Sequence, residues 1–369
     1  MKKINFSDPL ISSYEFKKII TKVFKNNYIS EGVISKTFEK KLKNLINVKH
    51  CLITNSGSSA LVLALKALNI KQNDEVIIPN ITFQATANAV NLIGGKVVLC
   101  DINKENLLMD PYDLKNKINK KTKAIIFVNV SGRGENIFQI NKLAKQKNIP
   151  LIEDSSEALF SKFGKKYYGT VGDIGCFSFA PNKIITTGQG GLLVTNINRY
   201  YKKMLIYKNQ GKTDTSFINS DSYDSEGFNF RSTDINAALG LSQLRYIEKR
   251  KRKLKQIYQY YKKNIIEHND CKVINFNLNK GELPLWTEVF SKKKEKIINY
   301  LKKQNIFCRS LWKPICVTKP YKKNIKKFKN TNQIYKNIFW LPSSLSLKER
   351  DQKKICNLIN SFFKNKYYN

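Results

Sequence analysis

The sequence predicts an α/β fold with a large, mixed but mostly parallel sheet and a smaller α+β domain at the C-terminal end. From residue 50 onward, short apolar runs alternate with helical patterns, which is typical of a parallel sheet covered by helices. Near residue 233 this alternation gives way to one long helical stretch. At 369 residues with 41% hydrophobic residues, the chain can bury a large core.

The first domain is expected over residues 1–245. Its strands are apolar runs bounded by turn residues, and we expect them at residues 51–54, 75–78, 97–100, 124–128, 151–153, 174–179 and 191–195. Apolar residues at helical spacing predict the intervening helices, at residues 58–69, 85–93, 111–118 and 137–147. Asp110 followed by Pro111 is a typical helix start.

The second domain is expected over residues 246–369. One long helix over residues 233–263 leads into it, and its basic run at 249–253 is most simply a solvent-exposed helix face. Beyond this helix we expect strands at 272–276 and 287–290 and helices at 292–304 and 348–363.

The formal net charge of +38 by itself suggests a polyanionic partner. However, the lysines are scattered through the whole chain instead of forming one basic block. This distribution favours a charged solvent face, so no nucleic-acid partner is expected. A positive potential would still steer a doubly charged anionic substrate toward a cleft.

The numbers of cysteines and histidines and the sequence of the N-terminus argue against further classes of protein. The seven cysteines form no CxxC pair, which predicts reduced, mostly buried thiols. No signal core or membrane-length apolar run is present, so we expect a cytoplasmic protein without membrane insertion. His50 and His268 are the two histidines, and this scarcity argues against a histidine triad or a multi-histidine metal site. No metal site is expected.

Four local motifs carry possible chemistry. The small-residue turn at 55–60 lies between a strand and a helix, where backbone N–H groups can bind phosphate. Asp154 ends an apolar strand, where ligands bind in open α/β sheets. Ser178 and Lys183 precede a glycine-rich turn, and residues 227–231 precede the long helix. Taken singly, these motifs read as a turn, a cap, a surface lysine and a loop.

In this order, the motifs resemble fold-type I pyridoxal phosphate enzymes. More narrowly, the chain resembles the DegT/DnrJ/StrS family of nucleotide-sugar aminotransferases, from about residue 28 to the C-terminus. The matching segments are residues 55–61, 74–79, 82–83, 153–158, 172–179, 183–191 and 227–231.

The resemblance implies pyridoxal 5'-phosphate as the cofactor. Lys183 would bind it covalently and later shuttle a proton, while Asp154 would pair with the pyridine nitrogen and keep it protonated. Phe83 would stack on the ring. The implied phosphate ligands are Ser58, Ser59 and Ser178, together with Asn229 from the other subunit of a homodimer with shared active sites.

Position 157 departs from the family. Gln or His commonly contacts the cofactor's phenolic oxygen there, whereas this chain has Glu157. A carboxylate facing a phenolate is repulsive, so Glu157 either turns aside or carries a raised pKa.

The resemblance also implies a reaction. Lys183 argues against the sugar dehydratases of the family, which have histidine at that position. L-Glutamate would donate its amino group to the keto carbon of a nucleoside diphosphate 4-keto-6-deoxyhexose, for surface glycan synthesis. The loops at 130–134 and 183–188 resemble those of enzymes that act at C4. Expected substrate-binding residues are Arg231, Arg309, Trp312 and Lys313, although Trp312 reads equally well as core.

Two alternatives remain open at this point. One is amination at C3 by an enzyme of the same family. The other is a non-catalytic binding or regulatory protein that keeps the fold and directs its charge at a polyanion.

Overall fold

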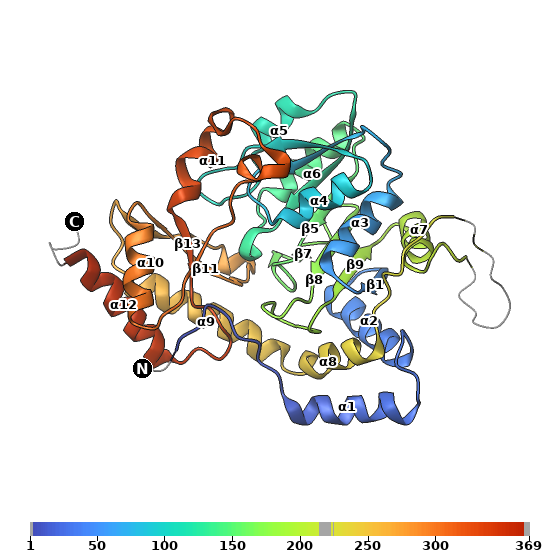
Figure 1. Ribbon diagram of the computed structural model, residues 1–369, viewed down its shortest axis with the longest axis horizontal. Helices are drawn as coiled ribbons and strands as arrows, with labels where there is room; N and C mark the ends of the chain where they lie inside the picture. The colour runs from blue at the N-terminus through green and yellow to red at the C-terminus, as the bar shows by residue number, and fades with distance from the viewer. Residues whose placement is uncertain (1–2, 214–222, 224, 365–369) are drawn as a thin grey trace.

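The chain forms a large sheet region and a smaller one, joined by a long helix (Figure 1). The computed structural model describes residues 3–213, 223 and 225–364.

The large sheet has seven strands in the order β1-β9-β8-β5-β4-β2-β3. All are parallel to one another except β9, which pairs antiparallel with both neighbours. The strands are β1 (His50–Thr54), β2 (Glu75–Pro79), β3 (Lys96–Cys100), β4 (Thr122–Val128), β5 (Leu151–Asp154), β8 (Ile174–Ser178) and β9 (Gly191–Thr195). All seven predicted strands and the mostly parallel sheet are thereby confirmed. The carboxyl ends of the parallel strands meet at one edge.

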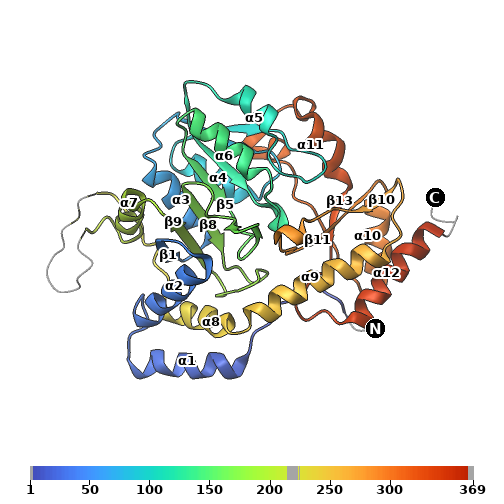
Figure 2. The same cartoon turned by 180° about the vertical axis from the view of Figure 1, so that it is seen from behind.

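Helices cover both faces of this sheet because successive strand residues point to opposite sides. Leu52 packs in one core with α3 (Gly57–Ala67), α4 (Gln84–Leu92) and α7 (Asn198–Lys208). Ile53 packs in the other core with α2 (Val33–Ile46), α5 (Pro111–Lys117) and α6 (Ile137–Gln146). Figure 2 shows α5 and α6 on the face opposite α3. A short hairpin joins β6 (Lys162–Phe163) to β7 (Lys166–Tyr167).

The prediction of a single helix over residues 233–263 is wrong. The chain forms α8 (Asp234–Leu244) and α9 (Ile247–Asn264), interrupted at Arg245 and Tyr246. The two helices have different packing partners: α8 lies against α1 (Ser13–Lys25) and α2, whereas α9 runs beneath the small sheet. Buried Arg250 supports the change of direction, because its Nη1 donates to Ile184 O at 2.6 Å. The predicted domain boundary at 245/246 falls at this interruption and stays a prediction.

The smaller region contains a four-stranded antiparallel sheet in the order β10-β11-β13-β12. Its elements are β10 (Cys271–Val273), β11 (Thr287–Ser291), α10 (Lys294–Lys303), β12 (Arg309–Ser310), α11 (Lys329–Ile334), β13 (Ile338–Leu341) and α12 (Glu349–Lys364). This confirms the predicted smaller α+β region. The sequence patterns did not predict α1, α2, α7, α11, β6, β7, β12 or β13. Short 3-10 helices lie at Val130–Gly132, Leu278–Lys280, Ile315–Val317, Lys319–Tyr321, Ile325–Lys327 and Tyr335–Asn337.

The N-terminal segment is held against the small sheet region by backbone hydrogen bonds. Phe307 N donates to Ile4 O at 2.9 Å, and Ser343 N donates to Phe6 O at 3.0 Å. As a result, Phe6 contacts the rings of Trp286 and Trp340, with centroid distances of 4.6 Å and 5.9 Å.

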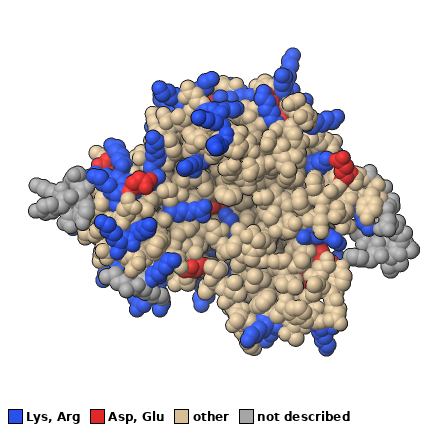
Figure 3. All heavy atoms as spheres, in the orientation of Figure 1, with Lys and Arg blue, Asp and Glu red and all other residues tan. Residues whose placement is uncertain are grey.

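Lysine and arginine side chains are scattered over the left half and the margins of the face shown in Figure 3, with few acidic side chains among them. This matches the scattered lysines of the sequence. None of the helices in the described part of the chain combines the length and apolar composition that crossing a bilayer requires.

Glu39, a partly buried residue of α2, is expected to make the free energy of unfolding depend on pH. Burial raises the pKa of Glu39 to about 7, and the nearby Lys208 charge opposes this shift. Between about pH 4.5 and pH 7 the folded state therefore holds a proton that the unfolded state releases. Stability from this group is complete below pH 4.5 and is lost as pH rises through 7.

We expect the Glu39→Gln variant to match the wild-type free energy of unfolding near pH 4.5 and to exceed it above pH 7. Denaturant titrations of both proteins across this range measure the difference. Parallel stability profiles for the two proteins would contradict the prediction.

Candidate active site

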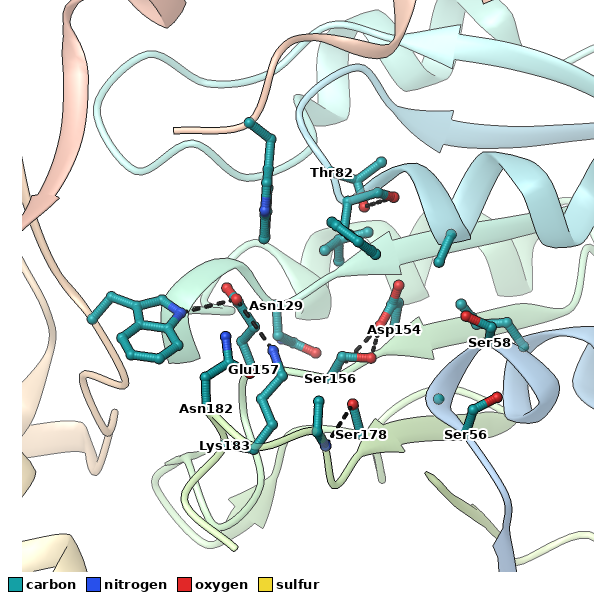
Figure 4. Close-up of a pocket in the computed structure, with 18 of the residues that line it drawn as sticks. Ser56, Ser58, Thr82, Asn129, Asp154, Ser156, Glu157, Ser178, Asn182 and Lys183 are labelled. Atoms are coloured by element: carbon teal, nitrogen blue, oxygen red, sulfur yellow. Dashed lines mark hydrogen bonds and ion pairs between the residues drawn. The ribbon is translucent and has the colours of Figure 1, made fainter. Parts of the chain in front are cut away.

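A cavity of about 330 Å³ lies where the carboxyl ends of β4, β5 and β8 approach the small sheet region. Its walls come from the start of α3, the turn after β2 and the glycine-rich turn after β8 (Figure 4). Three tryptophans complete its lining. It is the cavity in which the predicted motifs meet: Ser58, Phe83, Asp154, Glu157, Ser178, Lys183, Arg309 and Trp312 all line it.

The start of α3 forms one end of the cavity. Ser56 caps the helix: its hydroxyl accepts from Ser59 N at 3.0 Å. The first N–H groups of a helix have no intrahelical partner, so those at Gly57 and Ser58 face an anion-binding position. A side chain at Gly57 would place its Cβ 3.0 Å from the Ser178 Cβ, so glycine permits the close approach of α3 and β8.

Asp154 lies buried at the end of β5, in the middle of the cavity wall (Figure 4). Its Oδ2 accepts from Thr86 Oγ1 at 2.7 Å, and its Oδ1 accepts from Ser156 Oγ at 2.6 Å. Burial raises the pKa of Asp154, while these hydrogen bonds and the Lys183 charge oppose the shift. The carboxyl group is thus oriented by hydroxyl groups on both sides.

Lys183 reaches the cavity from the turn that follows β8. Backbone bonds close this turn, from Lys183 N to Ala180 O at 3.0 Å and from Thr187 N to Phe179 O at 3.0 Å. Gly188 adopts a φ of +78°, which favours glycine. The turn directs the Lys183 side chain toward Glu157, whose Oε1 lies 3.3 Å from the Lys183 Nζ (Figure 4).

Aromatic rings line the opposite part of the cavity. All three tryptophans of the chain, Trp286, Trp312 and Trp340, contribute to it together with Phe6 and Phe83. Phe83 is 54% exposed, and its ring centroid lies 6.4 Å from that of Trp312. The cavity therefore has an aromatic wall, in which the rings of Phe83 and the tryptophans are tilted or perpendicular to one another.

Four predicted site residues lie outside this cavity. The Ser59 hydroxyl is buried and donates to Asn55 Oδ1 at 2.7 Å. Asn229 is exposed, although its backbone oxygen accepts from Asn55 Nδ2 at 3.2 Å, next to the start of α3. The other two residues, Arg231 and Lys313, also do not line the cavity. The roles of all four stay predictions.

The sequence motifs did not identify several residues that line the cavity, nor Thr86, which does not line it but donates to Asp154. Thr86 and Ser156 were signalled only by their closeness in sequence to Thr82 and Asp154. Phe6, Trp286 and Trp340 had no local signal, because they reach the cavity through the docking of the small sheet region and the N-terminal segment.

The residues present fit pyridoxal phosphate. The N-terminus of α3 with Ser58 and Ser178 offers phosphate donors, and Gly57 leaves space beside them. Asp154 supplies a carboxyl group for a pyridine nitrogen, and Lys183 supplies an amine in the same cavity. Phe83 presents an exposed ring there.

Comparisons with known proteins agree with this geometry. The profile of the DegT/DnrJ/EryC1/StrS aminotransferase family matches residues 11–360. The GDP-perosamine synthase of Escherichia coli O157:H7 is 34% identical, with 99% of this chain and 100% of that protein aligned. The UDP-4-amino-4,6-dideoxy-N-acetyl-beta-L-altrosamine transaminase of Campylobacter jejuni is 31% identical, with 90% and 91% aligned.

Among solved structures, Helicobacter pylori PseC, an aminotransferase involved in the biosynthesis of pseudoaminic acid, is similar at a TM-score of 0.91 and 27% identity. The superposition covers 98% of this chain and 100% of that one. This likeness confirms the predicted fold class.

Proposed function

Because this chain belongs to the DegT/DnrJ/EryC1/StrS aminotransferase family, a family of pyridoxal phosphate-dependent nucleotide-sugar aminotransferases, we propose a specific reaction for it. The enzyme moves the amino group of L-glutamate to C4 of a nucleoside diphosphate 4-keto-6-deoxyhexose. The products are 2-oxoglutarate and a 4-amino-4,6-dideoxy sugar nucleotide for a surface glycan.

One observation carries the proposal: Lys183 and Asp154 share a single cavity with the helix start that can bind phosphate. An amine, a carboxyl group for the ring nitrogen and a phosphate position are the three protein contributions that transamination needs. When bound, pyridoxal phosphate supplies the aldehyde and the electron-withdrawing ring.

The proposed roles follow from position and chemistry. Asp154 holds a proton on the ring nitrogen, and Lys183 Nζ accepts the proton from the donor's α-carbon and returns it. Ser58 and Ser178 bind phosphate, and Phe83 covers the ring. Arg309 and Trp312, which line the cavity, are assigned to the sugar nucleotide, together with Arg231 and Lys313, which do not line it.

The choice of C4 and of a homodimer draws on separate observations. The name of the Campylobacter jejuni relative places a 4-amino group on a 4,6-dideoxy sugar. Asn229 is exposed beside Asn55, outside its own chain's cavity, which supports a contribution to the active site of a second copy. We propose that the cytoplasmic homodimer shares its active sites in this way.

The test is to incubate the protein and pyridoxal phosphate with L-glutamate and a panel of nucleoside diphosphate 3-keto- and 4-keto-6-deoxyhexoses, and to identify the product by mass and NMR. We expect 2-oxoglutarate and a sugar nucleotide aminated at C4. Amination at C3 would show that the proposed position of the new amino group is wrong. A failure to bind the cofactor, with nucleic-acid affinity that persists at physiological salt, would favour a non-catalytic role instead.

A further inference from the structure

The carboxylate of Glu157 lies at the end of the cavity farthest from the start of α3 (Figure 4). Its Oε1 accepts from Lys183 Nζ at 3.3 Å and from Trp286 Nε1 at 2.9 Å. Its Oε2 accepts from Ser131 N at 2.9 Å. Both oxygens are therefore engaged by protein donors, one of them the amine assigned to the chemistry.

Two chain segments, the loop at 130–134 and the segment that carries Trp286, hold this carboxylate in place. Leu285 N donates to Ser131 O at 2.9 Å, which ties the loop at 130–134 to the segment that carries Trp286. Gly132 has a φ of +100°, and a Cβ there would lie 2.0 Å from Leu283 O. The segments thus touch backbone to backbone, and Glu157 cannot turn aside without losing its contacts with both.

The Glu157–Lys183 pair is well shielded from water. The Lys183 side chain is 12% exposed and that of Glu157 is 7% exposed. At such burial, attraction between opposite charges is weakly screened, so the carboxylate of Glu157 holds the Lys183 side chain in place. The other charged side chains that line this cavity are Asp154, from β5, and Arg309, from β12. Asp154 also attracts Lys183, whereas Arg309 repels it.

We propose that Glu157 is a positioning residue for Lys183: its carboxylate is the counter-ion that holds the free ammonium group whenever Lys183 is not bonded to the cofactor. The inference rests on the proposed function and assigns Glu157 to the lysine instead of the cofactor's phenolic oxygen. A neutral amine is required to attack the aldehyde of pyridoxal phosphate with loss of one water. The counter-ion therefore sets the pH at which Lys183 captures the cofactor.

The experiment measures covalent capture of pyridoxal phosphate by protein freed of cofactor, from pH 6 to pH 9. Samples are trapped with borohydride, and modified Lys183 is counted by mass spectrometry. The Glu157→Gln variant keeps the size of the side chain but removes its charge. The matched control is Glu75→Gln, because Glu75 makes an ion pair with Lys96 at the same 3.3 Å, away from the cavity.

We expect the midpoint of the capture profile of Glu157→Gln to fall by about one pH unit, so that capture near pH 7 becomes about tenfold faster. Glu75→Gln should keep the wild-type profile, and Glu157→Asp, which restores the charge, should return toward it. Circular dichroism shows whether each variant is folded, and if Glu157→Gln does not fold, Glu157→Ala, which also removes the charge, takes its place with the same expected shift. A wild-type profile in Glu157→Gln, or an equal shift in Glu75→Gln, would overturn the role of Glu157 alone. No capture by the wild type at any pH would overturn the proposed function as well.

Discussion

Lys183→Ala is expected to abolish both covalent cofactor binding and transamination. The wild type with pyridoxal phosphate should absorb at about 400 nm through its lysine-linked cofactor, and this band should be absent from the variant. We expect the turnover rate to fall at least about a thousandfold, equivalent to about 4 kcal/mol. The physical reason is that the variant loses both the amine that holds the cofactor and the base that moves the proton.

Absorbance spectra and single-turnover assays with L-glutamate measure these effects. Lys96→Ala is the control, since Lys96 is an ion-paired lysine of the same large sheet that does not line the cavity. It should keep the band and the rate. A band at full strength in Lys183→Ala would show that another amine binds the cofactor.

Glu288→Ala is expected to lower the free energy of unfolding by about 3–5 kcal/mol, because it leaves a buried charge without its partner. Glu288 and Arg133 form an ion pair with side chains 0% and 2% exposed. The Glu288 Oε1 also accepts from Ser131 Oγ at 2.7 Å and from Trp340 Nε1 at 3.1 Å. The Arg133 guanidinium lies over the Phe276 ring, 4.4 Å from its centroid, so water cannot easily replace the lost carboxylate.

Denaturant titrations of Glu288→Ala and of the control Glu248→Ala test this prediction. Glu248 forms an ion pair with Lys251 but is 72% exposed, so its loss should cost less than about 1 kcal/mol. Equal losses in the two variants would contradict the expected role of burial. Because Ser131 also donates to Glu157, the Glu288→Ala variant is expected to disturb the cavity as well.

The strands of the large sheet could be predicted from the sequence because each of them is a short apolar run between turn residues. The division into α8 and α9 could not be predicted, because the sequences of both helices have helical periodicity. The interruption at Arg245 and Tyr246 follows from different packing partners and from the bond of Arg250 to Ile184 O, which is distant in sequence. Similarly, β12 has two residues, too few to produce a pattern.

In the candidate site, the sequence motifs predicted which residues take part, but they did not predict the contacts between these residues. The turn at the start of α3, Asp154 and Lys183 each follow or precede a strand, so the parallel topology predicts that they gather at one edge. The position of Glu157 was open to two interpretations, and the choice depended on Trp286 and Ser131.

The sequence by itself determined the α/β class, the order of the strands along the chain, the family and the candidate cofactor residues. The class and the strands follow from periodicity, and the family and the candidate cofactor residues follow from the resemblance of the local motifs to those of the family. Tertiary structure alone decided that three tryptophans and Phe6 line the cavity, that Ser59 is turned into a helix cap, and that Glu157 pairs with Lys183. Such contacts join residues that are far apart in the sequence or depend on side-chain orientation, and packing, not local pattern, selects them.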